Sequence, residues 1–473
     1  MTSMARSQQQ AADAVDRAID RAAGSRPIPG NQVRLLFDGP ATFAGMLDLI
    51  ETAERWVHLE SYIFRSDDIG HRFADALARR AREGLPVRVM VDWFGSWETR
   101  RRFWRRMTDA GVEVRQFHRP RPGELQSLLS RNHRKLVVAD GNRAILGGLC
   151  IGDEWAGDPG RGRLPWRDSS ILVEGPAAAG IDQTFARTWQ VAGPPVPAAH
   201  IAADVRERGN TAVRVLAGEP ARERAYRVSE LLLAGASERV WVTDAYLVAP
   251  RRLFRYLIDA AREGVDVRLL VPGSSDVPWV RNVTRIGYRD LLRAGVRIFE
   301  WGGSMLHAKT VVADGRWVRI GSSNLNHSSL SANYELDVLL DDPRAGQEME
   351  AQFRRDLESA AEVVTRPVRV PAPSVGSPPP RVSRASGTVV ARRANASCRR
   401  QAGAVWASGP AADGPWCALL LFSPSDGCGV WGPVFPAGSG GWRGGPAPDP
   451  GPGVEIRSLT VALAPSTNIF RHA

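Results

Sequence analysis

HRKLVVAD, residues 133–140, recurs later in the chain as HAKTVVAD, residues 307–314. The chain has 62 lysine and arginine residues in all, and Lys135 and Lys309 are its only lysines. A compact ammonium and a planar guanidinium are not equivalent groups. With 8 histidines in 473 residues, chance would place a histidine two positions before both lysines with a probability of roughly 3 in 10,000. The repeated pattern therefore indicates a function.

The residues after each histidine are apolar and small, which is typical of a buried strand. Because side chains on a strand alternate between faces, His-x-Lys places an imidazole and an ammonium on the same face. Two such pairs suit a phosphodiester, since one imidazole can attack phosphorus while the other protonates the leaving oxygen. The ammonium groups would neutralise the non-bridging oxygens. A metal site is disfavoured because the lysine would repel a cation, and no cofactor is expected.

The order of predicted elements is repeated as well. Strands are predicted at residues 54–64 and 238–248, each after an amphipathic helix, and the following helices close on Gly84 and Gly264. The two motif histidines are 174 positions apart (307 − 133), and these two glycines are 180 apart (264 − 84). Such offsets indicate a duplicated unit. We predict an α/β fold with two α/β/α halves, each with a mixed, mostly parallel sheet, packed with the active site between them.

The expected domain boundaries follow from this duplication. Residues 1–30 form a polar N-terminal segment with a short helix from Ala11 to Ala23, residues 31–200 the first half, and residues 201–366 the second half. Residues 367–473 form a Pro/Gly-rich, low-complexity tail that is expected to be disordered. Two further interpretations of this tail remain open: part of it could form a short hairpin near Leu419 to Phe422, and its sequence could be the product of a shifted reading frame.

Composition narrows the class of protein. A net charge of +11 and a pI near 10.3 favour anionic partners such as phosphate, nucleic acid or an acidic lipid surface, although an arginine-biased proteome would also produce them. No apolar run approaches the length of a membrane-spanning helix, and the N-terminus lacks the apolar core of a signal peptide. Four cysteines give no disulfide framework, so a cytoplasmic location is the default.

Further candidate residues follow each motif. In the second half, Gly321-Ser322-Ser323-Asn324 offers the Ser322 hydroxyl and the Asn324 amide to a phosphate. The first half has Gly147-Gly148-Leu149-Cys150 at the same place, so Cys150 is the third candidate phosphate ligand. Downstream lie two acids, Asp168 and Glu335. A carboxylate can hold the second nitrogen of a catalytic histidine, and we assign this orienting role to the pair.

These residues resemble the phospholipase D superfamily, which is marked by two copies of His-x-Lys-(x)4-Asp. The closer similarity is to bacterial cardiolipin synthases, over about residues 31 to 366. It rests on the words ESYIF (60–64), RNHRK (131–135), IGDEW (151–155), WRD (166–168), MLHAK (305–309) and GSSNLN (321–326).

The resemblance implies a covalent phosphohistidine mechanism in which His133 is the nucleophile and His307 the acid and later the base. It also implies that each carboxylate reaches across to the other half, Glu335 to His133 and Asp168 to His307. The candidate catalytic residues are the six motif members His133, Lys135, Asp140, His307, Lys309 and Asp314. Among them, Asp140 and Asp314 are expected to be mainly structural.

The implied reaction passes a phosphatidyl group to a lipid alcohol, or to water. Phosphatidylglycerol-type lipids would be donor and acceptor, and glycerol would be released. Three departures from the family matter, of which one is the tail after Val370, which does not resemble the family's ending. Cys150 stands where the family usually has asparagine, and a thiol is a weak donor. The chain also carries none of the N-terminal membrane helices that many relatives have, so it would reach lipid through its surface.

The expected partner is an anionic phospholipid, with peripheral association at the inner face of the cell membrane and no obligatory nucleic acid. The arginine-rich residues 100–106, with Trp93, Trp97 and Trp104 nearby, could contact headgroups, or they could form a solvated helix face. Two alternatives to a lipid transferase remain open. One is a phosphodiesterase acting on phospholipid or nucleic acid, and the other is a catalytically weakened, membrane-binding relative. The oligomeric state is left open.

Overall fold

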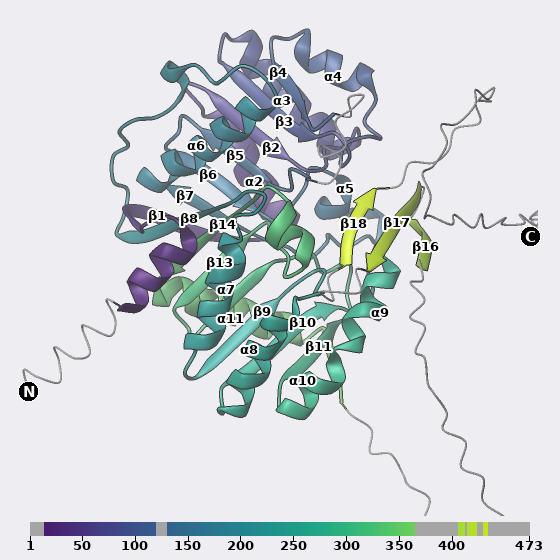
Figure 1. Ribbon diagram of the computed structural model, residues 1–473. Coiled ribbons are helices and arrows are strands. Elements are labelled where there is room, and N and C mark those ends of the chain that lie inside the picture. The colour runs from purple at the N-terminus through teal and green to yellow at the C-terminus, as the bar shows by residue number, and fades with distance from the viewer. Residues whose placement is uncertain (1–13, 120–129, 365–404, 412–413, 423–428, 434–473) are drawn as a thin grey trace, which may run out of the picture. The chain divides into compact units, whose positions relative to one another are not determined.

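The computed structural model describes part of the 473-residue chain, namely residues 14–119, 130–364, 405–411, 414–422 and 429–433 (Figure 1). The chain divides into a unit of residues 1–434 and a unit of residues 435–473. The second unit lies outside the described residues.

The first half alternates strands and helices as far as Phe117, and two further strands precede its next described helix. In chain order they are β1 (Ile28–Phe37), α2 (Asp38–Glu51), β2 (Val57–Ser61), α3 (Asp68–Arg82), β3 (Val87–Asp92), α4 (Arg101–Thr108), β4 (Glu113–Phe117), β5 (Leu136–Ala139), β6 (Arg143–Gly147), α5 (Asp153–Ala156), η2 (Pro159–Arg161), β7 (Ser169–Glu174) and α6 (Pro176–Val191).

The second half repeats this order. After η3 (Ala198–His200), which ends the first half, its elements are β8 (Thr211–Gly218), α7 (Arg224–Gly235), β9 (Arg239–Thr243), α8 (Arg251–Arg262), β10 (Asp266–Pro272), α9 (Pro278–Ile286), α10 (Tyr288–Ala294), β11 (Arg297–Trp301), β12 (Thr310–Ala313), β13 (Trp317–Gly321), η4 (Ser328–Ala332), β14 (Glu335–Asp341), α11 (Pro343–Leu357) and β15 (Ala360–Glu362). The internal duplication is confirmed.

Local chemistry explains where the helices begin and end. The Asp67 side chain accepts a hydrogen bond from the Gly70 N–H at the start of α3, as an N-cap residue does. Gly84, at φ +88°, and Gly264, at φ +94°, follow the ends of α3 and α8. Glycine reaches this left-handed conformation without steric cost, so the two predicted helix stops lie where the sequence places them.

One 15-stranded sheet runs through both halves in the order β15-β11-β10-β9-β12-β13-β14-β8-β1-β7-β6-β5-β2-β3-β4. Its middle is the antiparallel pairing of β1 with β8, which joins the halves. Residues that alternate along the strands pack into different apolar clusters. Helices α6 and α11 share one cluster that contains residues of both halves, whereas α2, α3 and α4 cover the other face of the first half and α7, α8 and α10 that of the second (Figure 1).

The α/β class is confirmed, but the prediction of a mostly parallel sheet in each half is wrong. Parallel pairing is confined to β2-β3-β4 and β9-β10-β11, and the other neighbours in this sheet are antiparallel. The cause is the turn after each motif. Asp140-Gly141 and Asp314-Gly315 all have positive φ, so the chain reverses sharply and β6 and β13 return beside β5 and β12. Strands β1 and β8 were not anticipated either.

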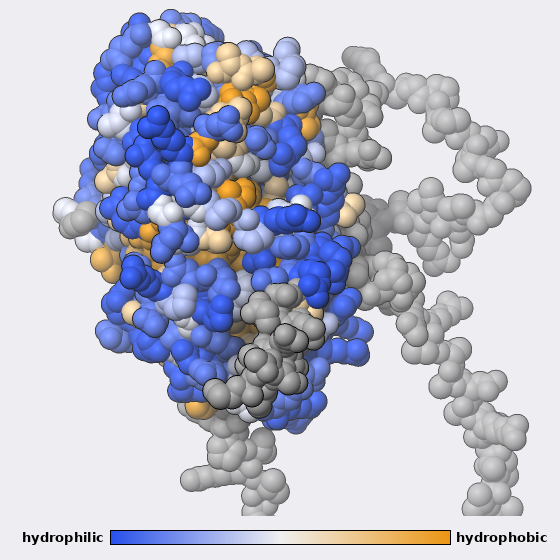
Figure 2. Space-filling view, turned by 90° about the vertical axis from the view of Figure 1, so that its left-hand side faces the viewer, coloured by the Kyte–Doolittle hydropathy of each residue, from blue (hydrophilic) through white to orange (hydrophobic). Residues whose placement is uncertain are grey.

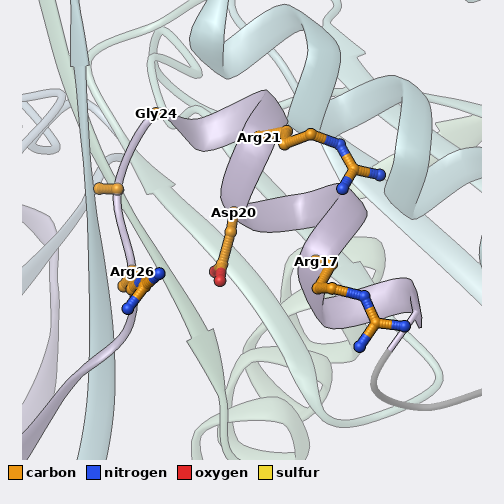
Figure 3. Close-up of a pocket in the computed structure, with 6 residues that line it drawn as sticks. Arg17, Asp20, Arg21, Gly24 and Arg26 are labelled. Atoms are coloured by element: carbon orange, nitrogen blue, oxygen red, sulfur yellow. The ribbon is translucent and has the colours of Figure 1, made fainter. Parts of the chain in front are cut away.

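The N-terminal segment is attached to the second half. Residues 14–23 are helical where described, and Ile19 is buried in the apolar cluster of the second half. Asp16 and Asp20 accept hydrogen bonds from Arg214 of β8 at 3.0 and 3.1 Å. Residues of this segment also line a pocket, which is formed by Arg17, Asp20, Arg21, Gly24, Ser25 and Arg26 (Figure 3).

Three strands lie in the C-terminal region. β16 (Val405–Ala411), β17 (Gly414–Phe422) and β18 (Gly429–Pro433) form an antiparallel sheet of their own. Leu419 to Phe422, where a short hairpin was suggested, lie in β17. The rest of the tail lies outside the described residues, so its predicted disorder stays a prediction, as do the domain boundaries.

No helix in the described parts of the chain is long and apolar enough to cross a membrane. The face shown in Figure 2 is mostly hydrophilic, with hydrophobic residues in separate groups rather than in one band.

Candidate active site

Each motif histidine is docked by its backbone onto the opposite half. His133 lies three residues before the start of β5, and its N–H donates to the carbonyl oxygen of Tyr334 at 2.9 Å. His307 lies three residues before the start of β12, and its N–H donates to the carbonyl oxygen of Arg167 at 2.7 Å. Tyr334 and Arg167 immediately precede the two candidate carboxylates. This crossed pairing of segments brings each histidine to a carboxylate from the other half.

The side chains continue the crossed arrangement. His133 Nδ1 lies 3.0 and 3.1 Å from the two carboxylate oxygens of Glu335, and His307 Nδ1 lies 2.7 Å from Asp168 Oδ2. Both carboxylates are buried. A carboxylate that accepts a hydrogen bond from Nδ1–H leaves Nε2 as the free base. The contacts are those that the family resemblance implies, and the catalytic roles stay predictions.

The two carboxylates are held differently. The Ser322 hydroxyl donates to Glu335 Oε2 at 2.5 Å and accepts from the Leu336 N–H at 2.9 Å. The first half has Gly148 at this place, where a Cβ atom would lie 2.2 Å from Asp168 Oδ1. Ser322 was assigned to phosphate, but its hydroxyl proton is committed to Glu335. Its contribution in this structure is therefore to hold the orienting carboxylate.

Both lysines are buried next to their own histidines. Lys135 and Lys309 are 2% and 1% exposed, and each Nζ donates to the carbonyl oxygen of the histidine two residues before it. A tyrosine ring lies under each ammonium, with Nζ 5.2 Å from the Tyr62 centroid and 6.0 Å from the Tyr246 centroid. Within the described residues, no three histidine, cysteine, aspartate or glutamate side chains are grouped to hold a metal ion.

The pKa values show that the two motifs interact electrostatically. Burial lowers the pKa of His307 well below its ordinary value, and the positive charges of Lys309, Lys135 and His133 lower it further. Burial also lowers the pKa of Lys309 to about 8 and raises that of Asp168 to about 6. Because charges of the first motif act on the second, the imidazole and ammonium groups form one electrostatic site.

Glu335 behaves differently from Asp168. Burial alone would raise its pKa, but the charges of His133 and Lys135 hold the pKa below its usual value. At neutral pH Glu335 is therefore ionised. Asp168, with a pKa of about 6, gains a proton when the pH falls modestly below neutral. The carboxylate opposite His307 is consequently the more sensitive of the two to pH.

The motif aspartates lie at the far end of their strands, away from the histidines. Asp140 accepts from the backbone N–H groups of Glu54, Arg55 and Trp56 at 2.7–3.2 Å. Asp314 accepts from those of residues 237, 238 and 239 at 2.9–3.0 Å. Both have positive φ, which Asp tolerates better than most residues. They fasten the turn to the start of the neighbouring strand, so neither contacts the reacting groups as a catalytic residue would.

The remaining phosphate candidates, Asn324 and Cys150, occupy equivalent places and are both buried. Asn324 Nδ2 lies 3.4 Å from Ser329 Oγ. Burial raises the pKa of Cys150, which the charges of Lys135 and Lys309 oppose. Cys150 therefore stays a neutral thiol within the field of both ammonium groups.

Replacing Cys150 by asparagine should raise the rate of turnover by about tenfold, because the amide would donate a hydrogen bond to a charged phosphate oxygen where a thiol donates weakly. The Cys150→Ala variant is the control and should show no gain. The measurement is kcat/KM of each purified variant. A rate for Cys150→Asn at or below that of the unmodified protein would show that the pocket is adapted to the thiol.

Two side chains of the site were overlooked in the sequence. The Tyr62 ring packs edge-on against His133 with centroids 5.0 Å apart, and the Tyr246 ring packs against His307 at 6.0 Å. They are 184 positions apart (246 − 62), the offset of the duplicated strands. The sequence shows that the two tyrosines are equivalent, but only the structure shows their contact with the histidines.

Comparison with known proteins adds to this geometry. A family model described as "Cardiolipin synthase, PLD-like domain" matches residues 46–154 and 231–357. "Cardiolipin synthase A" of Pseudomonas fluorescens is 33% identical over 353 residues, which cover 73% of each chain. "Cardiolipin synthase" of Alkalihalophilus pseudofirmus is 30% identical over 349 residues, 72% of this chain and 69% of that protein.

A solved structure supports the fold alone. The crystal structure of phosphatidylserine synthase from Haemophilus influenzae aligns with a TM-score of 0.57 at 16% identity, over 74% of this chain and 92% of that one.

Proposed function

The chain belongs to the cardiolipin synthase-like branch of the phospholipase D superfamily, and from this we propose that it is a phosphatidyltransferase. It forms cardiolipin from phosphatidylglycerol-type lipids through a covalent phosphohistidine. The observation that carries the proposal is the crossed pairing of two imidazoles with two carboxylates, His133 with Glu335 and His307 with Asp168.

In the first step, His133 Nε2 attacks the phosphorus of the donor lipid. A nitrogen–phosphorus bond forms and the bond from phosphorus to the glycerol oxygen breaks, while His307 donates a proton to that oxygen. Glu335 supports the attack because it holds the Nδ1 proton of His133. Lys135 and Lys309 neutralise the charge that accumulates on the non-bridging oxygens.

In the second step, His307 takes the proton from an acceptor hydroxyl, and that oxygen attacks phosphorus and releases His133. A lipid alcohol gives transfer and water gives hydrolysis. The pKa of His307 is low in the empty site because of burial and the surrounding positive charges. The negative charge of a bound phosphodiester counteracts both lysines, so His307 acquires its proton as substrate binds.

The proposal is tested by incubating purified protein with labelled phosphatidylglycerol vesicles and, separately, with single-stranded DNA. Formation of cardiolipin and glycerol supports it. Phosphatidic acid without cardiolipin would reduce the function to hydrolysis, and cleaved DNA with intact lipid would replace it by the nuclease alternative. The similarity to cardiolipin synthases favours lipid over nucleic acid.

We also propose peripheral contact with an anionic membrane through the arginine-rich residues 100–106. Of the tryptophans expected at this surface, Trp104 has to be excluded. Trp104 is 7% exposed and packs against Phe64 and Phe103, so it belongs to the core. Trp97, by contrast, is 55% exposed, and the arginines at 100–102, 105 and 106 on and beside α4 are exposed. This basic surface with one free indole suits acidic headgroups.

The rate should depend on pH as a bell with its maximum near neutral. Asp168, with a pKa raised to about 6 by burial, must be ionised to orient His307, so activity rises as pH increases through that value. Lys309, with a pKa lowered to about 8 by burial, must be protonated, so activity falls as pH increases further. The measurement is kcat/KM of the free enzyme between about pH 5 and pH 9.

In Asp168→Asn the acidic limb should disappear and the alkaline limb remain. A rate that is constant between about pH 5 and pH 7 in the unmodified protein would contradict the role of Asp168.

A further inference from the structure

The two halves differ sharply at the loop that follows the second strand of each parallel trio. After β3 the sequence is Trp93-Phe94-Gly95-Ser96-Trp97, whereas the equivalent residues after β10 are Gly273-Ser274-Ser275-Asp276-Val277. The first loop is aromatic and the second is small and polar. The two halves therefore present different loops, an aromatic rim at residues 93–97 and a polar rim at residues 273–277. This difference implies that the two loops face different ligand groups.

Asp276 is the charged residue of the polar rim, and it is joined to the second motif through Tyr246. The Tyr246 hydroxyl donates to the Asp276 carboxylate, with distances of 2.8 and 2.9 Å to its two oxygens. The same tyrosine ring packs against His307 and lies under the ammonium of Lys309. In the first half the position of Asp276 is taken by Ser96, which donates to the Tyr62 carbonyl oxygen at 3.1 Å.

Asp276 is placed where a ligand can reach it. The residue is exposed while Tyr246 is half-buried. The Ser275 hydroxyl also donates to Asp276 Oδ1, at 3.2 Å. Packing around the carboxyl raises the pKa of Asp276, and the hydrogen bonds from Tyr246 and Ser275 and the charge of the Lys309 ammonium oppose this rise. The carboxylate is therefore within electrostatic range of the motif, yet it is an additional acceptor that the proposed chemistry does not use.

The charge of this acceptor selects the kind of group it can bind. An ionised carboxylate accepts hydrogen bonds and repels phosphate oxygens, so it suits a neutral group with several hydroxyls. In the proposed function, His307 gives a proton to the departing glycerol and later takes one from the acceptor hydroxyl. The alcohol therefore occupies the side of the site where Tyr246 and Asp276 lie.

We propose that Asp276, oriented by Tyr246, accepts a hydrogen bond from a second hydroxyl of the glycerol group and thereby selects polyol over simple alcohol. Asp276 determines specificity and takes no part in bond making. This inference rests on the proposed function for the side on which the alcohol binds. It adds to that function a subsite for the glycerol headgroup.

The test compares two donor lipids that differ only in the hydroxyls of the headgroup, phosphatidylglycerol and phosphatidylpropanol, in otherwise identical vesicles. The measurement is the ratio of kcat/KM for lipid consumption, whatever the product. The variants are Asp276→Ala, Asp276→Asn and Tyr246→Phe. Asp290→Asn is the matched control, because Asp290 is exposed on α10 and forms an ion pair with Arg293 at 3.9 Å, away from the motif.

We expect Asp276→Ala to lower the preference for phosphatidylglycerol by about tenfold, chiefly through consumption of that lipid. Asp276→Asn and Tyr246→Phe should lower it less, and the control should leave the ratio unchanged. An unchanged ratio in both Asp276 variants that still consume lipid overturns the subsite. The identity of the product, cardiolipin or phosphatidic acid, tests the proposed transfer independently of this ratio.

Discussion

Replacing His133 by alanine should abolish both the transfer reaction and the covalent intermediate. Loss of a nucleophile or its partner in a preorganised site typically costs about 10⁴ in rate or more. His133 is the imidazole whose Nδ1 is held by Glu335, the carboxylate that stays firmly ionised. Its Nε2 is therefore the better base and nucleophile of the two. The measurement is the turnover of labelled phosphatidylglycerol, together with an assay for phosphatidyl groups bound to protein after quenching with denaturant at a non-acidic pH.

The matched control is His71→Ala, because His71 is an exposed histidine that packs against Phe103. It should keep both activity and adduct. His307→Ala should form adduct slowly and fail to release it, since the second step needs a base. An acid-labile phosphoryl adduct that persists in His133→Ala would show that the nucleophile has been assigned to the wrong half.

The site residues that can be predicted from the sequence are those that belong to a short, repeated motif. The two-residue period of extended backbone relates the directions of the histidine and lysine side chains, although β5 and β12 begin only after each lysine, at Leu136 and Thr310. The spacing of equivalent residues then reveals the duplication. These relations are local, so a single sequence suffices to predict the motifs, the α/β class and the helix stops at Gly84 and Gly264.

The parts that sequence missed depend on how the chain reverses and which surfaces meet. The direction of β6 relative to β5 depends on the positive φ of Asp140 and Gly141, and Asp-Gly favours such a hairpin. The joining of β1 to β8 pairs Asn31 with Thr211, which lie 180 positions apart (211 − 31), and the sequence of neither strand indicates which strand it pairs with.

Assignments of side chains failed where a local motif had two possible partners. Ser322 was a reasonable phosphate ligand until the structure placed Glu335 within 2.5 Å of its hydroxyl. Trp104 read as an interfacial aromatic among arginines, yet α4 turns it inward against Phe64. Asp276 carries no motif at all, and only its contact with Tyr246 makes it a candidate.

Lys309→Arg should lower the rate of transfer by about 10²–10³, although the positive charge is retained. Removing one preorganised donor from a reacting anion costs about this much. Lys309 is 1% exposed, and its Nζ reaches the His307 carbonyl oxygen above the Tyr246 ring. A guanidinium is planar and wider, and its insertion into a packed interior forces neighbouring side chains to move. The displaced groups would include His307 itself, whose position the reaction requires.

A comparison with Lys309→Met separates charge from shape. If charge alone mattered, the arginine variant would retain most of the activity and the methionine variant would lose it. We expect both to be similarly poor, with near-native unfolding temperatures showing that the fold survives. The sequence supports this expectation, because lysine occurs only at positions 135 and 309 and all the remaining Lys/Arg positions carry arginine. An arginine variant within about tenfold of the unmodified rate would mean that the site needs only positive charge.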